Sequence, residues 1–215
     1  WMPPEHSLYN CHHPRALPTA VKHTYLLGHP HSGMPAKKRK KKPKGGGVPP
    51  VQQQQTEEDL VRLLVASQEG KLPLVKQLAD VEGVDIDRGD GAHGITAVSQ
   101  ASSGGHEPVV RYLCEEKGAD ASKPNNDGTT PVNMASREGQ LDVVRYLVGE
   151  RGCDASTPDN NGTTPVLIAS QEGHLDVVRY LVGERGCDAS TPSNNGATPV
   201  YVASQEGHLN VVRYL

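Results

Sequence analysis

Histidines are the residues of this sequence whose recurrence could indicate catalysis or metal binding. His106, His174 and His208 each follow a glycine at one position of a repeating pattern. No Cys, Asp or Glu recurs beside them at the spacing that zinc sites use. The sequence also lacks GxSxG, HExxH, GxxxxGKS/T and a GxGxxG before a helix, the motifs of hydrolases, metalloproteases and nucleotide-binding proteins. We therefore predict a protein that is not an enzyme and holds no cofactor and no metal.

Cysteines are the second candidates for chemistry. The four cysteines form no CxxC pair and are too few for a disulfide scaffold. Cys153 and Cys187 are equivalent residues of the repeat, and we predict that both are small packing residues. The segment Cys11-His12-His13 stands alone, so we assign it no metal. With no secretory signal in the first 33 residues, this cysteine usage predicts an intracellular, reducing setting.

A run of basic residues lies within 37–44. Short lysine-rich segments act as nuclear-import signals or contact nucleic-acid phosphates, and a tail that only keeps a protein soluble has the same composition. No aromatic residue lies in the run, so base stacking on single strands is not expected. We suspect the nucleus as the location, with the cytoplasm otherwise. The import or phosphate-contact candidates are Lys37, Lys38, Arg39, Lys40, Lys41, Lys42 and Lys44.

The charge divides the chain into a basic tail and an acidic body. Residues 1–50 carry nine Lys or Arg against one acid, whereas residues 51–215 carry thirteen against twenty-four. We predict a disordered tail over 1–55 that ends in a Gly-, Pro- and Gln-rich linker at 45–55, and we expect Met34 to be the biological start. No segment stays apolar over the ~18 residues that a membrane-spanning helix needs.

A 34-residue repeat organises the acidic body. Four glycines recur at this period, namely Gly94, Gly128, Gly162 and Gly196. Residues 128–161 and 162–195 are identical at 29 of 34 positions, as expected for stacked copies that bury a shared core. Unit 1 starts near Thr56-Glu-Glu-Asp59, which predicts a helix cap. We place units 1 to 5 at about 57–93, 94–127, 128–161, 162–195 and 196–215, and expect the native protein to continue beyond the truncated unit 5.

Each unit carries the signals of two helices. In unit 3, Thr130 can cap a first helix that starts at Pro131 and ends at Gly139. A second helix starts at Leu141, with apolar residues at helical spacing, and ends at Gly152. The rest of the unit is rich in Ser, Thr, Pro, Asp and Asn, which predicts an extended turn.

This unit resembles the ankyrin repeat. The matching segments are Gly128-Thr-Thr-Pro-Val-Asn-Met-Ala-Ser, Gly173-His-Leu-Asp-Val-Val-Arg-Tyr-Leu and Gly118-Ala-Asp, and the resemblance covers about 56–215. It implies an all-α solenoid of helix-turn-helix units with short hairpin loops, preceded by the basic tail. It also implies that the recurring histidines are structural and bond to a neighbouring loop.

The sequence departs from the family pattern in three respects. Each unit is one residue longer than the usual ~33, and we place the extra residue between Leu147 and Gly152. Unit 2 has Thr96-Ala97 where Thr-Pro is expected. The histidine that the family carries after Thr-Pro-Leu is replaced by Asn133, Leu167 and Tyr201.

By the same resemblance, partners bind at the hairpin tips and on the exposed side of the first helices. The positions carried over are Gln68, Glu69, Asn126, Asp127, Thr129, Arg137, Glu138, Asn160, Asn161, Thr163, Gln171, Glu172, Asn194, Asn195, Ala197, Gln205 and Glu206. Four of them, Glu69, Glu138, Glu172 and Glu206, form a line of carboxylates. This line predicts an acidic groove for a basic or hydrogen-bonding peptide; the alternative is a solvating glutamate copied by duplication.

We therefore expect a monomeric, non-catalytic interaction module or scaffold. Its expected partners are proteins, basic peptides among them, with nucleic acid only through the basic tail and no membrane. Two alternatives remain open. One is the targeting arm of a longer enzyme such as a kinase or a ubiquitin ligase, and the other is a nucleic-acid-associated factor that uses the lysine run.

Overall fold

The computed structural model describes residues 50–215, with side chains from Glu57 onward. The predicted tail up to residue 49, with its lysine run and Cys11, lies outside these described residues. Within the described range the chain is helical and has no strand. The predicted all-α repeat solenoid is confirmed.

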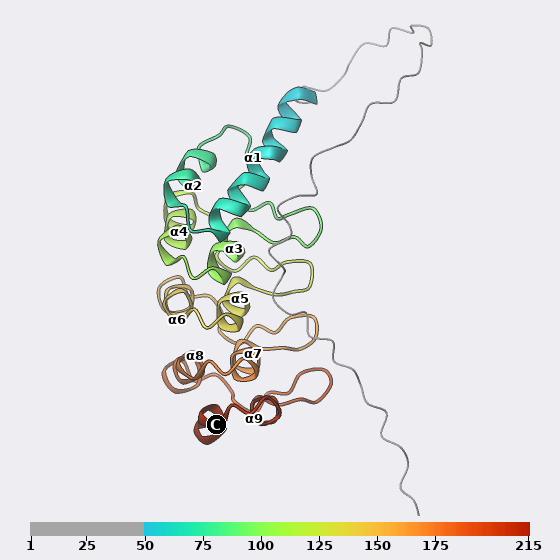
Figure 1. The fold of residues 1–215 in the computed structure, drawn as a ribbon, viewed down its shortest axis with the longest axis vertical. Coiled ribbons are helices and arrows are strands. Elements are labelled where there is room, and N and C mark those ends of the chain that lie inside the picture. Colours follow the sequence, from blue (N-terminus) through green and yellow to red (C-terminus); the bar gives the residue numbers. More distant parts are fainter. Residues whose placement is uncertain (1–49) are drawn as a thin grey trace, which may run out of the picture. The chain divides into compact units, whose positions relative to one another are not determined.

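The helices of this part of the chain form two columns, shown in Figure 1. The inner helices are α1 (Pro50–Gln68), α3 (Ala97–Ser103), α5 (Pro131–Arg137), α7 (Pro165–Gln171) and α9 (Pro199–Gln205). The outer helices are α2 (Leu72–Ala79), α4 (Glu107–Arg111), α6 (Leu141–Val144), α8 (Leu175–Val178) and α10 (Leu209–Tyr214). Loops project past the inner column between units. We call their outer parts, residues 88–95, 122–129, 156–163 and 190–197, the fingers.

A threonine caps each short inner helix as the sequence predicts. The hydroxyl oxygen of Thr130 accepts the main-chain N–H of Asn133 at 3.2 Å, and Thr164 accepts that of Leu167 at 3.2 Å. Thr96 makes the same bond in unit 2, although no proline follows it. These bonds satisfy an N–H group that the first helical turn leaves without a partner.

A glycine with positive φ ends each inner helix and starts the turn to the outer one. Gly173 has φ of 80°, and after it the main-chain N–H of His174 donates to the carbonyl of Ala169 at 2.9 Å. A side chain at Gly173 would meet the ring of His208 from the next unit. Glycine is therefore required here both by the backbone conformation and by the close approach of the next repeat.

Small aliphatic side chains fill the space between the columns and between units. Alanines at one inner position are fully buried at Ala101, Ala135, Ala169 and Ala203. Leucines at one outer position are fully buried at Leu113, Leu147 and Leu181. The buried residues form one continuous cluster from Leu60 to Val211. A chain without phenylalanine thus builds a thin core that is one helix pair deep in each unit.

The first helix starts earlier than the sequence analysis places it. α1 begins at Pro50, so residues 50–55, which we assigned to the linker, are helical. The proposed cap at Thr56-Glu-Glu-Asp59 is wrong, because these residues lie inside α1. Pro50 is tolerated at the first helical position, and the glutamines that follow are good helix formers.

The extra residue of each unit is accommodated in a π-helical turn at the end of the outer helix. These turns are η2 (Tyr112–Glu116), η3 (Arg145–Glu150) and η4 (Arg179–Glu184). The main-chain N–H of Arg151 donates at 3.0 Å to the carbonyl of Tyr146, five residues earlier. Because a π turn holds one more residue than an α turn, the insertion lies in the interval from Leu147 to Gly152 that the sequence predicts.

The threonine caps yield a matched pair of variants. Thr164→Ala removes the hydroxyl that accepts the N–H of Leu167, and we expect it to cost about 1 kcal/mol. For a domain of this size that loss lowers the melting temperature by about 2–4 °C in a thermal melt followed by circular dichroism. Thr164→Ser keeps the acceptor and should melt closer to the wild type. Equal melting temperatures for the two variants would contradict the capping role.

Candidate partner-binding surface

Three of the predicted glutamates close the inner helices. Glu138, Glu172 and Glu206 are the C-cap residues of α5, α7 and α9, and all three are exposed. We call these three residues the recognition row. A carboxylate at a helix C-terminus faces the negative end of the helix dipole, which is unfavourable for the helix. Helix stability therefore does not account for the recurrence of the row.

The glutamates differ in what they contact. Glu172 accepts a hydrogen bond from the side chain of Gln171 at 3.3 Å, and in unit 1 Glu69 pairs with Lys71 at 2.7 Å. In residues 57–215, no side-chain hydrogen bond or ion pair engages Glu138 or Glu206. At least two carboxylates of the recognition row are thus uncommitted and exposed.

The residues beside the row are polar and partly accessible. Arg137 and Gln171 are half-buried, whereas Gln68 and Gln205 are exposed. Arg137 is the one cation among these helix-end positions, and no side-chain bond engages it in the described part of the chain. The surface therefore carries hydrogen-bonding groups in every unit, but in unit 2 Ser103 and Gly104 stand at these positions and supply no carboxylate.

Three of the predicted finger asparagines connect neighbouring fingers. The side-chain amide of Asn160 donates to the carbonyl of Asn126 at 3.2 Å, and that of Asn194 donates to the carbonyl of Asn160 at 3.0 Å. Asn126 makes the same bond to Ala92 at 3.3 Å. Their main-chain N–H groups also donate to the preceding finger, at 2.8 to 2.9 Å. These asparagines are exposed, but their amides are used to hold the fingers together.

The other predicted finger residues differ in exposure. Asp127, Asn161 and Asn195 are exposed, and Thr163 and Ala197 are half-buried. Thr129 is only 5% exposed, so its side chain is not available to a partner. It is buried where the finger returns to α5, and its main-chain N–H donates to Oδ1 of Asn125 at 2.9 Å. Asp159 closes the next finger in the same way, a turn role that the sequence analysis did not assign.

The recurring histidine position is structural, as the family resemblance implies. Nε2 of His106 donates to the carbonyl of Gln68 at 2.9 Å, and Nε2 of His174 donates to that of Arg137 at 2.8 Å. A carbonyl can only accept, which sets the tautomer of both rings. Gln140 replaces histidine in unit 3, and its amide donates to the carbonyl of Ser103 at 3.4 Å. In units 2, 3 and 4 this position joins the unit to the one before it.

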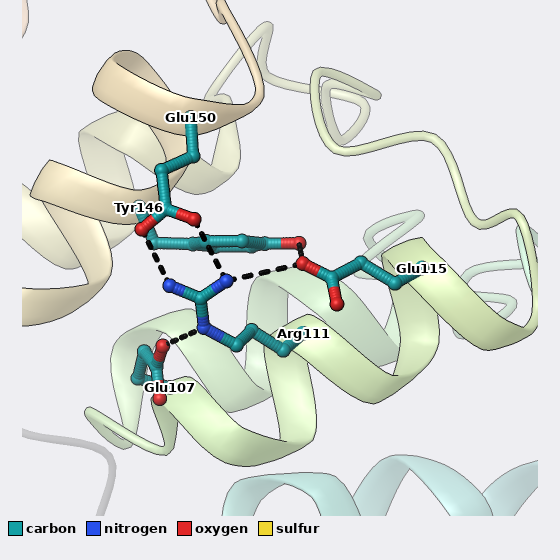
Figure 2. Close-up of polar contacts among 5 residues, drawn as sticks. All are labelled: Glu107, Arg111, Glu115, Tyr146 and Glu150. Carbon is teal, nitrogen blue, oxygen red and sulfur yellow. Dashed lines mark hydrogen bonds and ion pairs between the residues drawn. The ribbon is translucent and has the colours of Figure 1, made fainter.

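An ionic cluster on the outer helices was not predicted (Figure 2). Arg111 donates to Glu107, to Glu115 at 3.1 Å and to Glu150 of the next unit at 2.8 Å. Its guanidinium lies 4.3 Å from the ring centroid of Tyr146, whose hydroxyl donates to Glu115 at 3.2 Å. The hydrogen bonds that Arg111 donates to Glu150 and Glu107 raise the pKa of Arg111, and Arg111 lowers the pKa of Glu150. The cluster joins units 2 and 3.

The three cysteines of the array are unpaired packing residues, as predicted for two of them. Burial raises the pKa of Cys114 to about 12, and burial also raises the pKa of Cys153 and Cys187. The thiols of Cys153 and Cys187 lie 3.5 and 3.7 Å from carbonyls of the preceding unit. A thiol held in the neutral form is a poor nucleophile, so burial makes these cysteines less reactive.

Two further classes of site were sought in the described residues. No group of three or more His, Cys, Asp or Glu side chains in this range could hold a metal ion. No helix in the described range is long and apolar enough to cross a membrane.

A crevice of about 840 Å³ lies between the loops that follow η2 and η3, lined by buried Ala119 and Ala121 and by exposed Asp120 and Asp154. Both aspartates accept hydrogen bonds within their own turns.

The fold and its bonded fingers define a class of protein, the helical-repeat solenoid built of stacked helix pairs. Residues 63–159 and 151–215 match the family model described as Ankyrin repeats (3 copies). The two segments together cover well over half of the chain, and the chain belongs to the ankyrin-repeat family.

One similar curated protein is a far longer mouse protein. The chain is 38% identical over 66 residues to "Ankyrin repeat and SAM domain-containing protein 6" of Mus musculus. The match covers 31% of this chain and 7% of that relative. The similarity therefore extends to part of the repeat array and to a small part of the relative.

The neighbouring residues Asn160 and Asn161 allow an asparagine that bonds to the preceding finger to be compared with one whose side chain is free for a partner. Asn160→Ala removes the hydrogen bond from the side-chain amide of Asn160 to the carbonyl of Asn126 in the preceding finger. We expect a loss of about 0.5–1 kcal/mol in the free energy of unfolding. Asn161→Ala removes an exposed side chain without a bonded partner in the described chain and should change stability by less than about 0.5 kcal/mol. Urea denaturation measures both. A larger loss for Asn161→Ala would contradict this division.

Proposed function

We propose that the chain is a protein-interaction module that binds basic segments of partner proteins through the recognition row and the exposed finger tips. Ankyrin repeats are generally protein-interaction modules. The observation that carries the proposal is the recurrence of exposed glutamates at the C-caps of α5, α7 and α9, where the helix dipole disfavours them. Glu138 and Glu206 are uncommitted in residues 57–215, so both are available to a cation.

The spacing of the row matches that of an extended peptide. Packed helices lie about 8–10 Å apart, and an extended segment in the polyproline II conformation advances about 3.1 Å per residue with three residues per turn. Side chains three residues apart on such a segment lie on one face and therefore meet glutamates of successive units. An exposed ion pair contributes less than about 1 kcal/mol. Several pairs must act together with hydrogen bonds from neighbouring side chains such as Gln205 and Asn161.

The fingers support binding because they are already ordered. Side-chain and main-chain bonds join each finger to the one before it, from Ala92 to Asn194. A surface that is rigid before binding loses little conformational entropy when a partner arrives.

The same structure favours a non-catalytic role. His106 and His174, the histidines that could serve as acid or base, donate to main-chain carbonyls of the preceding unit. The cysteine thiols are held neutral by burial. The residues with chemical potential are thus occupied in holding the array together.

Charge reversal tests the proposed surface. We expect Glu138→Lys, Glu172→Lys and Glu206→Lys, combined in the full chain, to weaken binding of a labelled peptide with lysine at every third position by about tenfold or more. Three attractive contacts become repulsive in this variant. Fluorescence anisotropy at low and at high salt measures the affinity, and the wild-type affinity should fall as salt screens the pairs.

The matched control reverses three acids away from the row. Glu82, Glu116 and Asp142 are exposed, and no side-chain bond engages them in the described residues. Their combined change to lysine alters the net charge equally and should weaken binding much less. Equal losses for the two triple variants would show a general charge effect, and an unchanged affinity in the row variant would refute the surface.

We further propose that the lysine run imports the protein into the nucleus. Its support is the sequence alone, a run of seven basic residues within 37–44. The run lies outside the described residues.

A tagged full chain tests import. The combined change of Lys38, Arg39 and Lys40 to alanine should move the protein from the nucleus to the cytoplasm in fluorescence microscopy, because the cluster of positive charge is lost. Changing Lys22 and Lys71 to alanine is the control for loss of positive charge elsewhere. A distribution that does not respond to the triple change would exclude import by this segment.

A further inference from the structure

Cation–aromatic contacts join the outer helices of successive units. Arg111 lies 4.3 Å from the ring centroid of Tyr146, and Arg145 lies 4.7 Å from that of Tyr180. Arg179 lies 5.7 Å from the ring centroid of Tyr214. We call these three contacts the outer ladder. In each, the arginine belongs to one unit and the tyrosine to the next, so every contact spans a junction.

A glutamate from the next π turn reinforces two of these contacts. Glu150 in η3 pairs with Arg111 (Figure 2), and Glu184 in η4 pairs with Arg145 at 2.9 Å. Each arginine is therefore held by a ring and a carboxylate from the same segment of the next unit. Both π turns contain the residue that makes the repeat longer than usual. These longer turns therefore supply the glutamates that pair with the arginines of the outer ladder.

The glycine of each π turn makes room for the next tyrosine. A Cβ atom at Gly149 would lie 3.1 Å from the hydroxyl of Tyr180, and one at Gly183 would lie 2.7 Å from that of Tyr214. In unit 2, Glu115 takes this position and accepts the hydroxyl of Tyr146 at 3.2 Å. The π turn thus leaves room for the tyrosine side chain of the next unit and also supplies the glutamate that pairs with the arginine of the preceding unit.

The junctions are unequal. Across its junction Arg111 contacts Glu150 and Arg145 contacts Glu184, and Arg111 also contacts Glu107 and Glu115 of its own unit. Between units 1 and 2, Lys76 replaces arginine at 5.2 Å from the ring of Tyr112, and α2 is α-helical throughout. The ion pair at this junction instead joins Lys117 of unit 2 to Asp80, the C-cap residue of α2.

We infer that the outer ladder is a conformational device that makes the outer helices of units 2, 3 and 4 open together. Repeat arrays are stabilised by nearest-neighbour terms, and local opening follows the weakest of them.

Hydrogen–deuterium exchange of the full chain, followed by mass spectrometry, tests the coupling. Arg111→Gln should speed exchange about two- to fivefold in residues 141–151 of the next unit as well as in 107–118. Arg145→Gln should speed exchange in 175–185 as well. Arg151→Gln, which removes an exposed arginine outside the ladder, is the control and should leave all of these segments unchanged.

Gly149→Ala provides a second, independent readout. Alanine is the better helix former, so local propensity alone predicts slower exchange around residue 149. The outer ladder predicts the opposite in the next unit, because the new methyl group crowds the hydroxyl of buried Tyr180. Faster exchange in 179–184 supports the inference. Changes confined to the mutated helix in both variants, or an equal response to Arg151→Gln, would overturn it.

Discussion

Burial of small aliphatic faces between consecutive units is the interaction on which the rest of this structure depends. Inner helices of about seven residues and outer helices of four to eight residues, before their π turns, are too short to be stable alone in water. Each unit therefore exists as a helix pair only because its neighbours cover alanine, valine and leucine side chains such as Ala135, Val144 and Leu147, which are fully buried. The polar contacts between units depend on that packing and set the orientation of the packed units.

Packing of nearly identical aliphatic faces leaves the register between units weakly specified, and polar bonds supply it. Three kinds of contact cross each of the three junctions from unit 1 to unit 4: the hydrogen bond of the histidine or glutamine after the helix turn, that of the finger asparagine, and the cation over the outer tyrosine. They lie at three separate places on the unit, so together they set both the position and the rotation of the next copy. This use of polar side chains determines which of them remain free for a partner.

The sequence predicted those features that depend on local chemistry. The period, the threonine caps and the glycine turns follow from residues close together in the chain, and Thr164 and Gly173 take their expected places. The bond of His174 to the preceding unit was implied by the family resemblance. Other features that depend on neighbouring units were not predicted. The burial of Thr129 and the side-chain bond of Asn160 arise only when two fingers meet. The start of α1 at Pro50 was missed because proline and glutamine suit both a linker and a helix.

The five differences between units 3 and 4 show which positions are free to change. Gln140 and His174 both donate to the preceding unit, and Asp159 and Ser193 both help to close a finger. Two more differences lie on α5 and α7 at positions that are buried in unit 4, Leu167 and Ile168. The remaining difference, Arg137 against Gln171, changes a charge beside the row and removes no bond from the scaffold. Divergence that preserved the array thus altered the charge of the proposed binding surface, as expected when packing and recognition use different side chains.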